Sequence, residues 1–138
     1  MERVNLEVVF NKTQEKELNE MKSIDHEATK IFETIVPKIK GFNHTWLIKL
    51  DDKTIGYIDL IVEEESLVYY MDLAIKPGYR TKKILVDILN EIKKQALSSS
   101  IYLETGIDRN ILGEAFNELN INRIKEKDKR KVYSLNNK

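Results

Sequence analysis

A cluster of basic residues stands directly before the clearest amphipathic helix of the sequence. Arg80, Lys82 and Lys83 lie within four residues, and an apolar helical pattern begins at Ile84. The first backbone N–H groups of a helix lack intrahelical acceptors and carry a partial positive charge. A loop that leads into such a terminus is an anion site, typically for phosphate. A basic turn in front of a core helix, with no ligand, is the alternative reading.

Two carboxylates on neighbouring predicted strands could serve an amine. Asp72 lies in a predicted strand over residues 67–75, and Glu104 ends a short one over residues 101–104. A helix separates these strands, so they should form a right-handed parallel crossover and lie side by side. Such carboxylates can hold a cationic amine or accept its proton through water. A structural or solvent-facing role is the alternative for each of them.

The remaining reactive side chains are few. Tyr133, on the last predicted strand, carries a hydroxyl that could donate a proton. His26 and His44 are the only histidines and lack the spacing of a metal site. The chain has no cysteine, which excludes disulfides, thiolate catalysis and zinc–thiolate sites. The sequence therefore predicts no metal site.

The hydrophobic pattern indicates which elements position these residues. Strands are predicted over residues 4–10, 45–50, 55–62, 67–75, 101–104, 122–126 and 131–135. Helices are predicted over residues 24–36, 84–97 and 111–119, with a short one around 18–21. Ser23 and Asp108 are the expected N-caps of two of them. Short turns between the central strands imply an antiparallel meander that joins a parallel pair, so the sheet is mixed.

The composition is that of one α/β domain over residues 1–138. Hydrophobic residues make up 41% of the 138 residues, enough for a single core. The net charge is zero, which argues against nucleic acid as a partner. Residues 122–138 nevertheless hold seven basic against two acidic side chains. No apolar run approaches a membrane span, and the N-terminal residues do not resemble a signal peptide, so we expect a cytoplasmic protein without membrane contact.

One segment carries a resemblance to a known family. The residues Leu73-Ala74-Ile75-Lys76-Pro77-Gly78-Tyr79-Arg80 form a strand that ends in Pro-x-Tyr-Arg and leads straight into the long helix. This segment, with the element order of the chain, resembles the GNAT superfamily of acetyl-CoA-dependent N-acyltransferases. The resemblance implies a central mixed sheet flanked by helices and acetyl-CoA as cosubstrate. Many relatives form dimers, so a homodimer is also expected.

The resemblance also implies roles for individual residues. The backbone of Leu73, Ala74 and Ile75 would contact the thioester. The pyrophosphate would lie on a loop formed by Arg80, Thr81, Lys82, Lys83, Ile84 and Leu85. Asn110 would stand near the place of a family asparagine, although one residue out of register. The resemblance assigns no catalytic residue that this chain retains, so the candidates for catalysis are those named above from their own chemistry: Tyr133, Asp72 and Glu104.

Three positions depart from the family pattern. Lys83 stands where the family has glycine, and Leu85 stands where it has glycine or alanine. Glycine at these places lets the backbone approach the phosphates closely. Phe116 stands where many relatives have a tyrosine that acts as a general acid, and phenylalanine has no hydroxyl. We therefore expect either an acetyltransferase acting on a primary amine of a small molecule or peptide, or a module of the same fold that binds a CoA ester or a protein partner without turnover.

Overall fold

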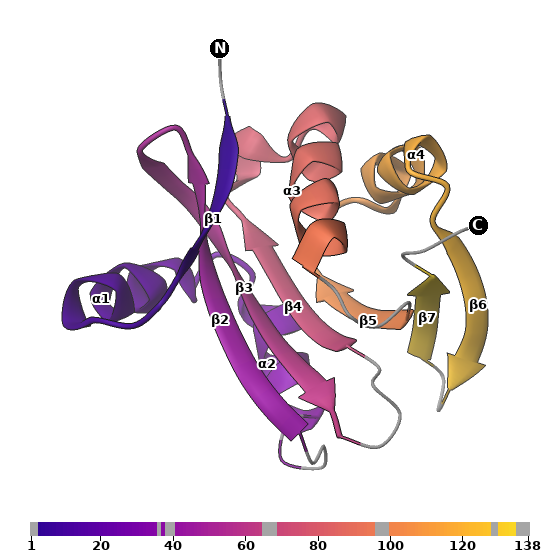
Figure 1. The fold of residues 1–138 in the computed structure, drawn as a ribbon, viewed down its shortest axis with the longest axis horizontal. Coiled ribbons are helices and arrows are strands. Elements are labelled where there is room, and N and C mark those ends of the chain that lie inside the picture. Colours follow the sequence, from indigo (N-terminus) through magenta and orange to yellow (C-terminus); the bar gives the residue numbers. More distant parts are fainter. Residues whose placement is uncertain are drawn as a thin grey trace.

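The computed structural model describes residues 3–35, 37, 41–64, 69–95, 100–127 and 130–134. They form a seven-stranded sheet flanked by helices (Figure 1). The strand order is β1-β2-β3-β4-β5-β7-β6. The strands are β1 Val4–Val8, β2 Gly41–Leu50, β3 Lys53–Glu63, β4 Tyr69–Ile75, β5 Ser100–Thr105, β6 Asn122–Lys127 and β7 Arg130–Ser134. Among the strands of the described residues only β4 and β5 pair in parallel, so the predicted mixed sheet is confirmed.

Four α-helices cover the two faces of this sheet (Figure 1). They are α1 Lys12–Met21, α2 His26–Ile35, α3 Lys82–Gln95 and α4 Arg109–Glu118, and a short 3-10 helix, η2 Pro77–Tyr79, precedes α3. Buried side chains of α1 and α2 pack on one face, and those of α3 and α4 on the other. Each long predicted helix is present, although its ends differ from the pattern by one to two residues.

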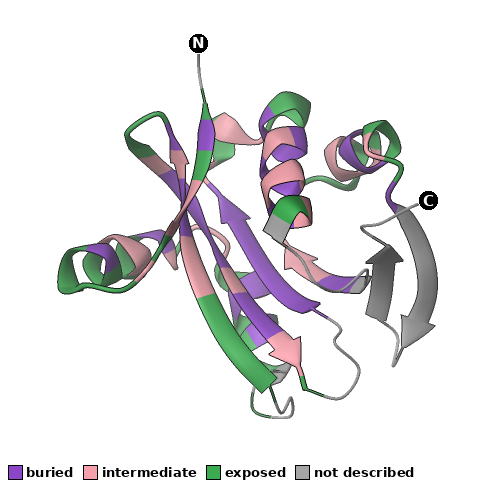
Figure 2. Cartoon of the chain, viewed as in Figure 1, coloured by how far each residue is buried: buried purple, intermediate pink, exposed green. Residues whose placement is uncertain are grey.

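Strand β4 lies at the centre of the molecule, and all seven of its residues are buried (Figure 2). Its odd-numbered residues, such as Met71 and Leu73, pack against α3 in the largest core cluster. Its even-numbered residues face α1 and α2: Tyr70 packs with Phe32, and Ala74 with Met21. A strand covered on both faces explains why its sequence is a nearly continuous apolar run. Asp72 interrupts this run on the α2 face.

Glycine is required where β3 meets the end of β4. Gly56 pairs with Ile75, and a Cβ at Gly56 would collide with the carbonyl of Ala74. The two backbones can approach this closely only because the side chain is missing.

The helix caps are partly as predicted. Asp108 caps α4, because its carboxylate accepts a hydrogen bond from the Asn110 N–H at 2.7 Å. The prediction that Ser23 caps the second helix is wrong. Residues 22–25 form a turn, α2 begins at His26, and the Thr29 N–H bonds the carbonyl of Asp25. Among the described residues, no helix has both the length and the apolarity needed to cross a membrane.

Candidate active site

The parallel ladder between β4 and β5 ends before β4 does. Its last pair joins Leu73 to Thr105, whereas β4 continues to Ile75. The Lys76 N–H bonds the carbonyl of Ile55 on the β3 side. Because backbone groups alternate between the two neighbouring strands, those of Ile75 face the β5 side, beyond the last β4–β5 pair. The end of β4 is therefore a strand edge in the middle of a sheet.

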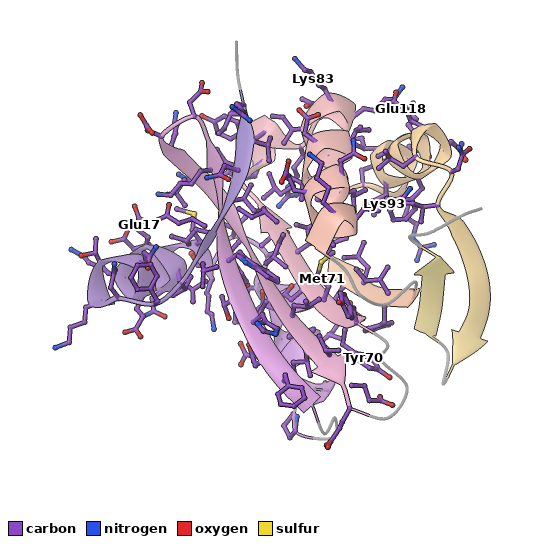
Figure 3. All side chains as sticks on the ribbon, in the orientation of Figure 1. Glu17, Tyr70, Met71, Lys83, Lys93 and Glu118 are labelled. Atoms are coloured by element: carbon purple, nitrogen blue, oxygen red, sulfur yellow. The ribbon has the colours of Figure 1, made fainter. Side chains whose placement is uncertain are left out.

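The chain leaves this edge through η2 and enters the N-terminus of α3. Thr81 caps the helix: its hydroxyl accepts from the Ile84 N–H at 3.3 Å, and its carbonyl from the Leu85 N–H at 3.0 Å. The N–H groups of Lys82 and Lys83 precede these bonds and lie at the helix tip, where an anion is stabilised. Both lysine side chains are exposed, and Lys83 points away from the sheet (Figure 3).

The bulky residues of this loop do not crowd the helix tip. Leu85 is fully buried in the main core, and Ile84 is also buried there. Lys82 forms an exposed ion pair with Glu118 of α4 at 3.0 Å. Of the two residues that stand in the glycine places of the family, Leu85 thus packs into the protein, and Lys83 extends into solvent.

Arg80 makes two contacts within the protein. Its Nε donates to the carbonyl of Ile75 at 2.8 Å, and its Nη2 forms an ion pair with Asp25 Oδ1 at 2.7 Å. Asp25 lies in the turn between α1 and α2, and its second oxygen, Oδ2, is buried without a hydrogen-bond partner. Gly106, just past the end of β5, leaves room for this carboxylate, because a Cβ there would collide with it.

Asp25 was not identified as a site residue from the sequence. Its partner Arg80 is 55 residues away along the chain. The available signal was a residue of the N-capping type one helical turn before Thr29, and the prediction placed the cap at Ser23 instead.

Asp72 belongs to a buried polar cluster that joins α2 to the sheet. Its Oδ2 accepts hydrogen bonds from the hydroxyls of Thr29 and Tyr57, each at 3.0 Å, and those hydroxyls lie 2.6 Å apart. Burial raises the pKa of Asp72 to about 6, although both hydrogen bonds oppose the shift. Burial also raises the pKa of Tyr57. Oδ1 of Asp72 is buried and unpaired.

Asp72 is part of a polar row across four strands. In register, Thr45 stands opposite Asp59, Asp59 opposite Asp72, and Asp72 opposite Glu104. Burial raises the pKa of Asp59 as well. Glu104 is partly exposed and accepts a hydrogen bond from the hydroxyl of Tyr102. The predicted neighbourhood of Asp72 and Glu104 is confirmed, and the row faces α1 and α2.

The other candidates lie farther along the chain. Asn110 is exposed in the first turn of α4. The backbone of Tyr133 pairs with Ile101 and Arg123, and its side chain lies outside the described residues. Phe116 is buried in the main core. Within the part of the chain that the structure describes, no group of three potential metal ligands occurs.

Comparisons with known proteins agree with this arrangement. The sequence model of the family described as "Acetyltransferase (GNAT) family" matches residues 10–116. No curated protein matches the chain.

Solved structures resemble the fold at low sequence identity. A chimera of the spermidine N-acetyltransferase SpeG from Vibrio cholerae and hSSAT has a TM-score of 0.66 at 10% identity, over 96% of this chain and 95% of that one. The N-acetyltransferase PseH of Campylobacter jejuni, in complex with acetyl coenzyme A, has a TM-score of 0.56 at 14% identity, over 94% of this chain and 96% of that one. A Bacillus subtilis acetyltransferase in complex with CoA has a TM-score of 0.56 at 12% identity, over 97% of this chain and 98% of that one. At these identities the similarity shows the fold.

Proposed function

The chain belongs to the GNAT family of acetyltransferases, and we propose that it transfers the acetyl group of acetyl-CoA to a primary amine. The observation that carries the proposal is the edge of β4. This strand continues for two residues past its last pair with the parallel strand β5 and then leads into the N-terminus of α3. The first N–H groups of a helix have no acceptor within it, and two exposed lysines stand at this terminus. A thioester at the strand edge and a pyrophosphate at the helix tip would belong to one extended cofactor.

In this arrangement the loop holds the pyrophosphate mainly through its backbone. The N–H groups of Lys82 and Lys83 bind phosphate oxygens, and both side chains add positive charge. Thr81 fixes the helix tip, and Ile84 and Leu85 anchor it in the core. We assign Asn110, which is exposed in the first turn of α4, to the same cofactor.

We assign the acetyl group to the segment of Leu73, Ala74 and Ile75, in which the backbone groups of Ile75 face the open edge of β4. A backbone N–H of this segment donates to the thioester carbonyl and stabilises the negative charge that develops on its oxygen. The neutral amine attacks the carbonyl carbon, so that a C–N bond forms and the C–S bond breaks. The nitrogen loses a proton, and the departing thiolate of CoA gains one.

Two carboxylates and one tyrosine would accept and donate these protons. Glu104 is exposed enough to meet an incoming ammonium group, and Asp72, whose pKa is about 6, lies beside it on the same face. We assign the binding of the amine to Glu104, and we assign to Asp72, which is buried, a role in accepting the proton of the amine through water. Tyr133 is our candidate for the acid that protonates CoA, because Phe116 cannot do so.

An amine is the favoured acceptor for two reasons. The polar row of Asp59, Asp72 and Glu104 offers negative charge on the face opposite α3. A protein of the same fold is a spermidine N-acetyltransferase. The acceptor is thus a small molecule or a peptide with a free amino group.

The first test is a calorimetric titration of the purified protein with acetyl-CoA, beside free CoA. Micromolar binding supports the proposal, and no binding at millimolar concentration contradicts it. A panel of amines then follows, with CoA release read by a thiol-reactive dye. The protein itself contains no cysteine, so each thiol detected comes from the cofactor.

A module without turnover is the second candidate. Phe116 in the tyrosine place favours it, since a buried phenylalanine supplies no proton. Tight binding of acetyl-CoA without thiol release from any amine would favour this alternative. A homodimer and a cytoplasmic location remain predictions from the sequence.

A further inference from the structure

Arg80 is engaged by the protein on two sides of its guanidinium group. Nε is bonded to the carbonyl of Ile75, the last residue of β4, and Nη2 to Asp25 in the turn between α1 and α2. Only 20% of the Arg80 side chain is exposed, against 47% for Lys82. Within this loop, therefore, the lysines reach solvent and the arginine is held inside the protein.

Asp25 is built into this place rather than merely near it. Its side chain is 9% exposed, and Gly106 at the end of β5 provides the space that it fills. Through its main chain it also accepts the Thr29 N–H at the start of α2. A buried carboxylate needs a charged partner, and the described part of the chain gives it Arg80 alone as an ion-pair partner.

We propose that Asp25 and Arg80 act together as a positioning pair that sets the end of β4 for the cofactor. This inference rests on the proposed function and deepens it. Arg80 supports acetyl-CoA binding indirectly: it fixes the carbonyl of Ile75 and so orients the strand edge that meets the thioester. Asp25 in turn fixes Arg80 from the α1–α2 turn. The cofactor site therefore depends on a residue from the face that we assign to the acceptor.

The direct alternative is that the Arg80 side chain binds phosphate. The two roles give opposite expectations for Asp25. If Arg80 binds phosphate, Asp25 competes for the same cation, and its neutralisation leaves acetyl-CoA affinity unchanged or raises it. If Arg80 is a positioning residue, neutralising Asp25 frees the guanidinium from its place, and affinity falls.

The experiment measures the dissociation constant of acetyl-CoA by calorimetry for Asp25→Asn, Arg80→Gln and the double variant. We expect each single variant to weaken binding roughly three- to thirtyfold, and the double variant to be no weaker than the worse single one. Glu91→Gln, which breaks the ion pair of Lys94 near the far end of α3, is the matched control and should bind like the wild type. Circular dichroism and melting temperature confirm that the variants are folded.

Arg80→Lys provides a second measurement that does not depend on how Asp25 variants fold. A lysine keeps the charge but has one donor group in place of the fork that spans Ile75 and Asp25. We expect it to bind as weakly as Arg80→Gln. Wild-type affinity in Arg80→Lys, or equal or tighter binding in Asp25→Asn, would overturn the positioning role alone. A wild-type protein that binds no acetyl-CoA would overturn the proposed function as well.

Discussion

At the residue scale, the environment of Asp72 determines its protonation. The residue is 1% exposed, and its carboxyl group accepts two hydroxyl hydrogen bonds, yet Oδ1 has no partner. Desolvation outweighs the two hydrogen bonds, so the pKa rises to about 6. At neutral pH most copies are ionised, and slightly below it a large fraction is protonated. Strongly shifted pKa values cluster at functional sites, and this supports the role that we propose for Asp72.

The same shift links stability to pH. An unfolded aspartate has a pKa of about 3.9, so between about pH 4 and 6 the folded protein binds more protons than the unfolded chain, and stability falls as the pH rises. Asp72 contributes on the order of 3 kcal/mol to this fall. In Asp72→Asn the contribution disappears. In urea unfolding, the free energy of unfolding should fall less from pH 4 to pH 7 in the variant than in the wild type. A smaller fall should persist, because the pKa of Asp59 is also raised. An undiminished pH dependence in Asp72→Asn would contradict the assignment.

The two ends of α3 allow a charge-matched test of phosphate binding. Lys83 stands at the N-terminal tip and Lys93 in the last turn (Figure 3). Lys83→Gln removes a cation beside the proposed pyrophosphate and should weaken acetyl-CoA binding roughly three- to tenfold, less at high salt. Lys93→Gln loses the same charge far from the tip and should leave the calorimetric affinity unchanged. Equal effects of both would indicate a general effect of charge.

At the element scale, the site depends on how the α1–α2 turn meets the end of β5. The Asp25 carboxylate occupies the position that a side chain at Gly106 would need, and the same carboxylate oxygen forms the ion pair with Arg80. After Ile75 the chain leaves the sheet, and Arg80 bonds back to the carbonyl of Ile75. Asp25, in the turn between α1 and α2 on the sheet face opposite α3, holds Arg80 through the ion pair.

Gly106→Ala should therefore destabilise the protein. The new methyl group overlaps the Asp25 carboxylate, which must move and loosen its ion pair, at a cost of about 1–3 kcal/mol. Gly78→Ala is the control, because nothing lies within 4 Å of a Cβ at that position. Thermal unfolding followed by circular dichroism should separate the two variants. Equal melting temperatures would show that the site tolerates the methyl group.

The sequence predicted the elements better than the contacts between them. Leu85, Ile88 and Leu89 recur with the period of a helix, and such local patterns identified α3 and the strands around it. The placement of Asp72 and Glu104 on adjacent parallel strands followed from the order of the elements. The partners Thr29 and Tyr57 did not, because they lie 43 and 15 residues from Asp72 and carry no local signature. Long-range polar contacts of this kind need the folded chain.

At the scale of the whole molecule, a bound cofactor should stabilise the native state. A ligand at one hundred times its dissociation constant adds about 2.7 kcal/mol. For a domain of 138 residues this raises the melting temperature by roughly 8–12 °C. Differential scanning fluorimetry with acetyl-CoA measures the shift. Acetyl-pantetheine, which lacks the pyrophosphate, should give a much smaller one, and equal shifts would argue against the role of the α3 tip.

The order of the last two strands bears on how the protein folds during synthesis. In the sheet β7 lies between β5 and β6, although β6 comes first along the chain. When β6 leaves the ribosome, its future neighbour has not yet been made, and β5 still presents an open edge. Such edges invite pairing with other chains. A stop codon before Arg130 would remove β7, the strand that connects β6 to the sheet. In the truncated chain β6 would then have no strand to pair with, so the sheet would lose both strands.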